Sequence, residues 1–154
     1  PDRVVTRRGT DGGPGVFGFL RGRPRAWPVT FDERHPARWF RLIESQHLTT
    51  AASLDTRDYR RGDARCGEGP IPVRCRSCSC GTCWVGVVSG KDHLSAVDAR
   101  ERTTISALGY LESDEPRPVV RLACMAQATG PVTIVIPPWN GQVGVRLARA
   151  LRET

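Results

Sequence analysis

The pattern of apolar and polar residues predicts short β-strands rather than a bundle of long helices. Four blocks are rich in branched and aromatic residues and are bounded by glycine, proline or charged residues. They cover residues 27–31, 84–88, 119–123 and 132–136. Because the chain of 154 residues contains 16 Gly and 12 Pro, we expect turns and irregular connections between these blocks.

Two further segments predict helices. Pro36 stands before an apolar and charged run, residues 37–44, which is typical of a helix with proline in its first turn. Trp39, Leu42 and Ile43 would then face the interior. A second helix of three to four turns is expected after a start resembling a capping box, Ser95 to Asp98. Strands and helices together predict an α+β fold.

Charge and length suggest one core domain with a basic extension. The net charge is +7, and residues 1–30 carry six Arg against two Asp, which gives +4 for this part alone. We therefore expect a basic, partly irregular docking arm over residues 1–50, a core domain over 51–138 and a tail over 139–154. Phe17, Phe19 and Trp27 interleave with arginines too sparsely to indicate a nucleic-acid site, so nucleic acid is not an expected partner.

The cysteines carry the clearest chemical signal. Four residues separate Cys75 from Cys80, and two separate Cys80 from Cys83, which is the spacing of a plant-type [2Fe-2S] loop, with Cys124 as a remote fourth ligand. No run is apolar enough to span a bilayer, and no apolar stretch follows Arg7-Arg8 as it would in an export signal. We therefore expect a cytoplasmic chain. In that compartment cysteines are expected to bind metal rather than to form disulfides.

The cysteine loop and its surroundings resemble the plant-type and related bacterial [2Fe-2S] ferredoxins. The resemblance rests on the loop, the valine-rich block after it, Arg121 to Cys124, and Gly130 to Ile134. It implies a β-grasp, ferredoxin-like domain that takes part in electron transport. It also implies that Cys75 and Cys80 bind one iron of the cluster and that Cys83 and Cys124 bind the other.

Three features depart from the family. Cys78 stands where the family usually has a small residue, so it is a competing ligand. The interval between Cys83 and Cys124 holds 40 residues, longer than in simple ferredoxins. The first 68 residues lack a clear pattern of strand, hairpin and helix, so we expect a rebuilt amino half. Cys66, which lies there, is interpreted as a thiol that binds no metal.

Residues around the expected ligands would tune the cluster. Small or polar loop residues allow backbone N–H groups to approach the sulfurs. These residues are Arg76, Ser77, Ser79, Gly81 and Thr82. Positive charge from Arg74, Arg76 and Arg121 predicts a reduction potential above the roughly −400 mV typical of plant-type ferredoxins. The acid-rich stretch from Asp92 to Glu115 is expected to be a solvated helix face or a docking patch for a basic partner.

The sequence predicts an electron carrier and no catalytic residues. Shuttle ferredoxins of the family are usually acidic, whereas this chain is basic, so a subunit bound to a larger oxidoreductase of dehydrogenase, hydrogenase or oxygenase type is favoured over a free ferredoxin. One alternative is a structural zinc module, with possible nucleic-acid binding, built on Cys75-x2-Cys78 and Cys80-x2-Cys83. Another is a thiol–disulfide site at Cys80 and Cys83, although a strand follows them where such sites open a helix.

Overall fold

A computed structural model of the chain describes residues 24–32, 35, 37–109 and 113–137. The elements in chain order are β1 (Ala26–Thr30), β2 (Trp39–Ile43), α1 (Leu48–Ser53), β3 (Trp84–Ser89), the 3-10 turn η2 (Lys91–His93), α2 (Ala99–Ala107), β4 (Val120–Leu122) and β5 (Val132–Val135). These elements confirm the α+β class and the strands expected from all four apolar blocks.

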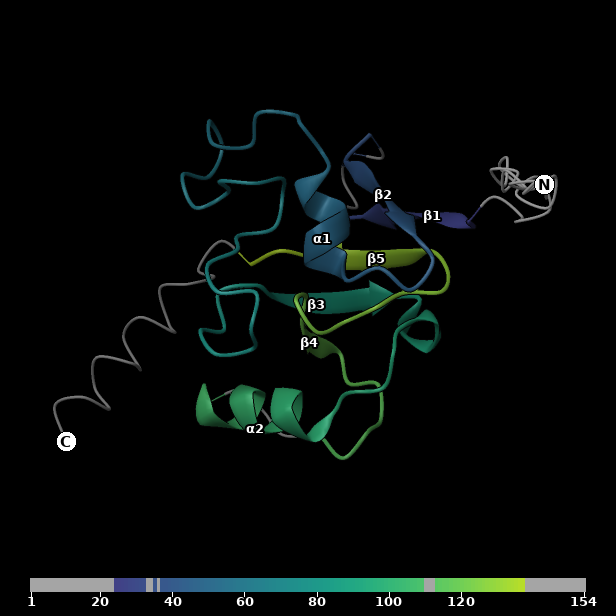
Figure 1. Cartoon of the computed structure of the whole chain (residues 1–154), viewed down its shortest axis with the longest axis vertical. Coiled ribbons are helices and arrows are strands. Elements are labelled where there is room, and N and C mark those ends of the chain that lie inside the picture. The colour runs from purple at the N-terminus through teal and green to yellow at the C-terminus, as the bar shows by residue number, and fades with distance from the viewer. Residues whose placement is uncertain (1–23, 33–34, 36, 110–112, 138–154) are drawn as a thin grey trace, which may run out of the picture.

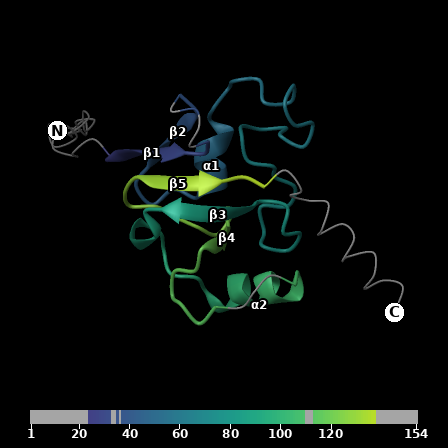
Figure 2. The same cartoon turned by 180° about the vertical axis from the view of Figure 1, so that it is seen from behind.

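The five strands form one mixed sheet in the order β2-β1-β5-β3-β4. β1 and β2 pair antiparallel, β1 runs parallel to β5, and β3 pairs antiparallel with both β5 and β4. Figures 1 and 2 show α1 across one face of the sheet, beside β2, and α2 beyond the edge formed by β4. The first and last strands of the described chain are therefore neighbours.

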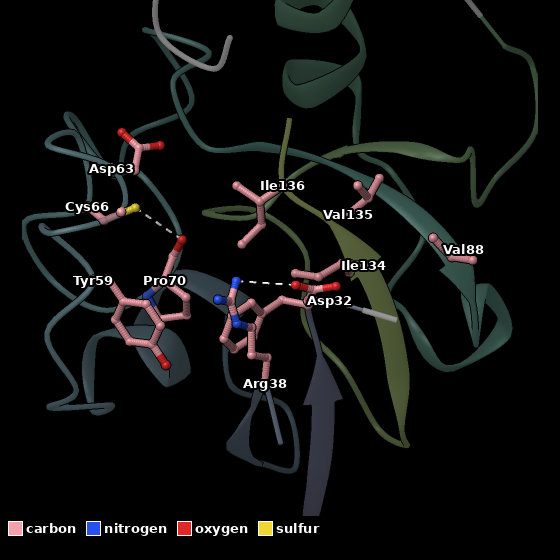
Figure 3. A pocket seen from close by; sticks show the side chains of 12 residues that line it. Asp32, Arg38, Tyr59, Asp63, Cys66, Pro70, Val88, Ile134, Val135 and Ile136 are labelled. Carbon is pink, nitrogen blue, oxygen red and sulfur yellow. Dashed lines mark hydrogen bonds and ion pairs between the residues drawn. The ribbon is translucent and has the colours of Figure 1, made fainter. Parts of the chain in front are cut away.

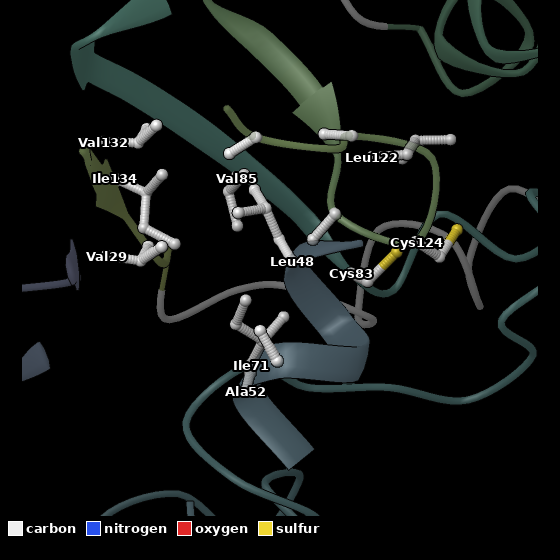
Figure 4. Close-up of a cluster of buried hydrophobic side chains, with 14 of the residues drawn as sticks. Val29, Leu48, Ala52, Ile71, Cys83, Val85, Leu122, Cys124, Val132 and Ile134 are labelled. Carbon is white, nitrogen blue, oxygen red and sulfur yellow. The ribbon is translucent and has the colours of Figure 1, made fainter. Parts of the chain in front are cut away.

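The hydrophobic core lies between the sheet and α1 and extends to three of the cysteines, Cys78, Cys83 and Cys124. Val29, Val85 and Ile134 point from the strands toward Leu48 of α1 (Figure 4). All four side chains are fully or almost fully buried, and burial of each such side chain contributes about 1.5–3 kcal/mol. Cys83 and Cys124 belong to the same buried cluster, so the core supports one end of the cysteine site.

The prediction of a helix after Pro36 is wrong, because residues 39–43 form strand β2. Phe40 and Leu42 are buried, whereas Trp39 is 46% exposed, which is the alternation of a strand with one face on the core. The apolar residues of this segment fit both a helical and a strand period. Pairing with β1, in the register Val29 to Phe40, provides the interactions that favour the strand.

The expected division of the chain at residue 50 does not coincide with an edge of the sheet. β1 and β2 come from the segment assigned to a docking arm, yet β1 pairs directly with β5, the last strand of the sheet. A hairpin of two strands, followed by a helix, therefore does occur before residue 54. Residues 1–23 of the expected arm, and the expected tail over 139–154, lie outside the described residues.

The second helix, α2, is shorter than expected and has a different cap. Asp98 is the N-cap, and its carboxylate accepts a hydrogen bond of 2.7 Å from the backbone N–H of Glu101. Ser95 instead pairs with Gln127: its N–H donates to the carbonyl of Gln127, and its hydroxyl accepts from the N–H of Gln127. Of the helices in the described ranges, none combines the length and the apolar character needed to cross a membrane.

Candidate metal centre

The cysteine loop occupies the connection that leads into β3. It is wound tightly, because Arg76, Cys78 and Gly81 all have left-handed backbone conformations, with φ of 53°, 59° and 66°. A side chain at position 81 would also displace a neighbouring residue. A Cβ atom at this position would lie 2.1 Å from Cδ1 of Leu108, at the end of α2.

The four cysteines expected to be ligands are free thiols that hydrogen-bond in two pairs. Cys80 donates to the sulfur of Cys75, and Cys83 donates to the sulfur of Cys124. The pairs also interact electrostatically, Cys75 with Cys124 and Cys80 with Cys83. The fold thus places a residue 41 positions after Cys83 beside the loop (Figure 4).

Hydrogen bonds stabilise the thiolate of Cys75. Partial burial raises the pKa of this thiol, but the hydroxyl of Ser79 and the backbone N–H groups of Ser77 and Ser79 donate to the sulfur, as does the thiol of Cys80. Together they lower the pKa of Cys75 to about 5. Cys75 and Cys80 are partly exposed, so this pair lies toward the surface.

The second pair is buried. The hydrogen bond from Cys83 lowers the pKa of Cys124, and the same hydrogen bond raises the pKa of Cys83 above its usual range. The backbone N–H of Cys78 is a further donor to the sulfur of Cys124. Two adjacent buried sulfurs could both be thiolates only if a nearby positive charge compensated them, and a bound metal would supply such a charge.

Cys78, the expected competing ligand, turns its side chain toward α2. Its Sγ lies 3.6 Å from Oγ1 of Thr104, and that hydroxyl donates to the carbonyl oxygen of Cys78 at 2.8 Å. Cys78 therefore reaches the cysteine site through its backbone N–H, and its thiol, which packs against the helix, still interacts electrostatically with Cys124.

Cys66 is separate from the four paired cysteines. Its thiol is buried and donates to the carbonyl of Pro70 at 3.3 Å, and burial raises its pKa to about 11. It lines a cavity of about 730 Å³ together with Tyr59, Ile134 and the ion pair Arg38–Asp32 (Figure 3). Of the described residues that line this cavity, none is one of the paired cysteines.

Two of the three arginines expected to add positive charge are neutralised by carboxylates. Arg121 and Glu101 are 0% and 1% exposed, and they form two parallel hydrogen bonds of 2.9 Å. Arg76 forms an ion pair with Glu68. The basis for a raised reduction potential is therefore weaker than expected.

The prediction of a solvated acidic helix face is wrong for Glu101, because this residue is buried. A signal for this was present, because Glu101 lies four residues from Val97 and four from Ile105, a spacing that places an acidic residue between two apolar ones on one face of a helix. Its partner Arg121 lies 20 positions along the chain, and no sequence spacing predicted this pair.

The donor set fits a binuclear cluster. Among the described residues, no group of three or more Cys, His, Asp or Glu side chains is placed so that it could hold a metal ion. A [2Fe-2S] cluster takes two thiolates at each iron, so the ligands it requires are two adjacent pairs with N–H donors aimed at the sulfurs. The pairs Cys75–Cys80 and Cys83–Cys124 have this form.

Comparisons with known proteins leave the family open. No family model matches the chain, and no curated protein matches it. A solved structure described as "Ferredoxin reductase in carbazole 1,9a-dioxygenase" is 16% identical, with a TM-score of 0.47 over 76% of this chain and 27% of that chain. Its "FAD apo form" is 15% identical, with a TM-score of 0.43 over 75% and 30%. This chain thus spans less than a third of either protein, and likeness of this extent assigns it no activity.

Proposed function

We propose that this chain binds one [2Fe-2S] cluster through Cys75, Cys80, Cys83 and Cys124 and transfers single electrons. The observation that carries the proposal is the meeting of four free thiols in two hydrogen-bonded pairs, one of which includes the remote Cys124. When bound, such a cluster supplies a centre that accepts and releases one electron.

The residues around the thiols would stabilise the negative charge of four thiolates. The N–H groups of Ser77 and Ser79 donate to Cys75, at 3.4 Å for Ser77, and the N–H of Cys78 donates to Cys124. Burial of Cys83 and Cys124 would exclude water from one iron, while the partial exposure of Cys75 and Cys80 would leave the other near a docked partner.

The sheet supports assignment to the β-grasp, ferredoxin-like class and, with the cysteine spacing, to the plant-type or bacterial [2Fe-2S] ferredoxins. The amino-terminal hairpin and the helix α1 supply elements that the sequence pattern had not revealed. The cysteine loop leads into β3, and Cys124 follows β4, the strand paired with β3.

The proposed setting is a cytoplasmic, non-catalytic electron-transfer subunit of a larger oxidoreductase. The net charge of +7 argues against a free acidic shuttle and favours a stably bound partner with complementary charge. Six cysteines without a disulfide in the described fold suit a reducing compartment, where thiolates remain available to metals.

The test is metal and sulfide analysis of the anaerobically prepared full chain. About two iron and two sulfide per chain are expected, with a reddish colour that bleaches on reduction. Cys124→Ser is expected to abolish the colour. Cys66→Ser, which keeps a donor to Pro70, is the matched control and is expected to retain it. Zinc in place of iron, or full colour in Cys124→Ser, would exclude the proposal.

A further inference from the structure

Helix α2 contacts both parts of the chain that carry the paired cysteines. We infer that α2 is a positioning helix, which fixes the cysteine loop relative to the strand that leads to Cys124. This inference rests on the proposed function, because it assigns a role toward the same cluster. It also gives a reason for the long interval between Cys83 and Cys124, in which α2 lies.

One face of α2 holds the loop. Arg100 donates from Nη2 to the carbonyl of Ser77 at 2.7 Å, and Thr104 donates to the carbonyl of Cys78 at 2.8 Å. Leu108, the C-cap residue, lies over Gly81. Positions 100, 104 and 108 are spaced by four, so they form one row along the helix. Each residue of the row contacts a different point of the loop between Cys75 and Cys83.

The adjacent face of α2 holds β4. Glu101 binds the guanidinium of Arg121 in a bidentate manner and also accepts from the N–H of Leu122 at 2.8 Å. The remaining guanidinium nitrogen of Arg121 donates to the carbonyl of Ser95 at 2.7 Å. Bidentate pairing fixes both distance and orientation, which a single hydrogen bond does not.

The connection from β4 to the thiols is short and rigid. Leu122 pairs with Trp84 across β3 and β4, and the N–H of Ala123 donates to the carbonyl of Cys83 at 3.0 Å. A shift of β4 relative to α2 would therefore move Cys83 and Cys124 together, relative to the part of the loop that carries Cys75 and Cys80. A buried ion pair contributes little net stability compared with apolar packing. The role of Glu101 and Arg121 is therefore to fix the position of β4 relative to α2 rather than to stabilise the fold.

The experiment compares two neighbouring threonines of α2 in the reconstituted full chain. Thr104→Val removes the hydroxyl that binds the loop. Thr103→Val is the matched control, because the hydroxyl of Thr103 is exposed and donates to Ala99 within the helix, at 2.8 Å. Thr104→Ser keeps the hydroxyl and tests rescue, and Glu101→Gln tests the contact with β4.

The measurements are the rate at which a chelator bleaches the cluster and the g-values of the reduced protein in electron paramagnetic resonance. Loss of a group that orients metal ligands typically weakens metal binding by about 10- to 100-fold, so faster bleaching of about this size and shifted g-values are expected for Thr104→Val and Glu101→Gln. Thr103→Val and Thr104→Ser should match the parent chain.

The outcomes separate the two claims. If Glu101→Gln does not fold, Thr104→Val still decides the inference. A parent chain that holds the cluster, with Thr104→Val as stable and as spectroscopically normal as Thr103→Val, would overturn the positioning role alone. A parent chain that binds no iron and sulfide would overturn the proposed function and the inference with it.

Discussion

Alanine at position 81 is expected to destabilise the fold for two separable reasons. The left-handed backbone of Gly81, with φ of 66°, costs a residue with a Cβ about 1–2 kcal/mol. The new Cβ would also lie 2.1 Å from Cδ1 of Leu108, and forcing extra volume into a packed site costs about 1–3 kcal/mol. The sum predicts a loss of about 2–5 kcal/mol in the free energy of unfolding.

Gly109→Ala separates the two reasons. Gly109 has a φ of 77°, and a Cβ there would meet no atom within 4 Å among the described residues. It should therefore show the backbone cost alone, and the entropy that alanine removes from the unfolded chain should be similar at both sites. Urea unfolding followed by circular dichroism should place Gly81→Ala about 1–3 kcal/mol below Gly109→Ala.

The double substitution Gly81→Ala with Leu108→Ala should recover part of this difference, because it removes the atom that the new Cβ meets. Equal destabilisation by Gly81→Ala and Gly109→Ala would show that the contact with Leu108 adds no cost, and would refute the reasoning.

Three further predictions concern other parts of the fold. Phe40→Ala should cost about 3–5 kcal/mol in urea unfolding, whereas Trp39→Ala should cost far less; a larger loss at Trp39 would contradict strand β2. Ser45→Gly should stabilise the chain by about 0.5–1 kcal/mol, since φ of 66° favours glycine by more than its entropic cost; a lower denaturation midpoint would count against this conformation. Burial raises the pKa of Cys66 from 9.0 to about 11, so its contribution to stability is complete below pH 9 and is lost as the pH rises toward 11. Cys66→Ser should therefore lose less stability than the parent between these pH values, and identical pH profiles would show that Cys66 is not buried as a neutral thiol.

The positions of β3, β4 and β5 were largely predictable from the sequence, because their branched residues strongly favour strands. β2 was not predictable, because Phe40, Leu42 and Ile43 satisfy both helical and strand periods. Only its pairing with β1 decides between them. The hairpin that joins the amino half to the domain was missed for the same reason.

The candidate site, too, was predictable only in part. The spacing of Cys75, Cys80 and Cys83 is local, so it was readable as a ligand loop. The pair Glu101–Arg121 joins residues from a helix and a strand, and no local pattern encodes that contact. Glu101 was read as a solvated charge, although its position on the inner face of the helix was a usable signal.

The central claim is that Cys75, Cys80, Cys83 and Cys124 together hold a one-electron centre. The most direct measurement is an anaerobic reductive titration of the full chain followed by electron paramagnetic resonance. A single one-electron wave with about one spin for every two irons is expected. A chain that contains iron and sulfide but gives no such signal at any potential, or one that contains only zinc, would contradict it.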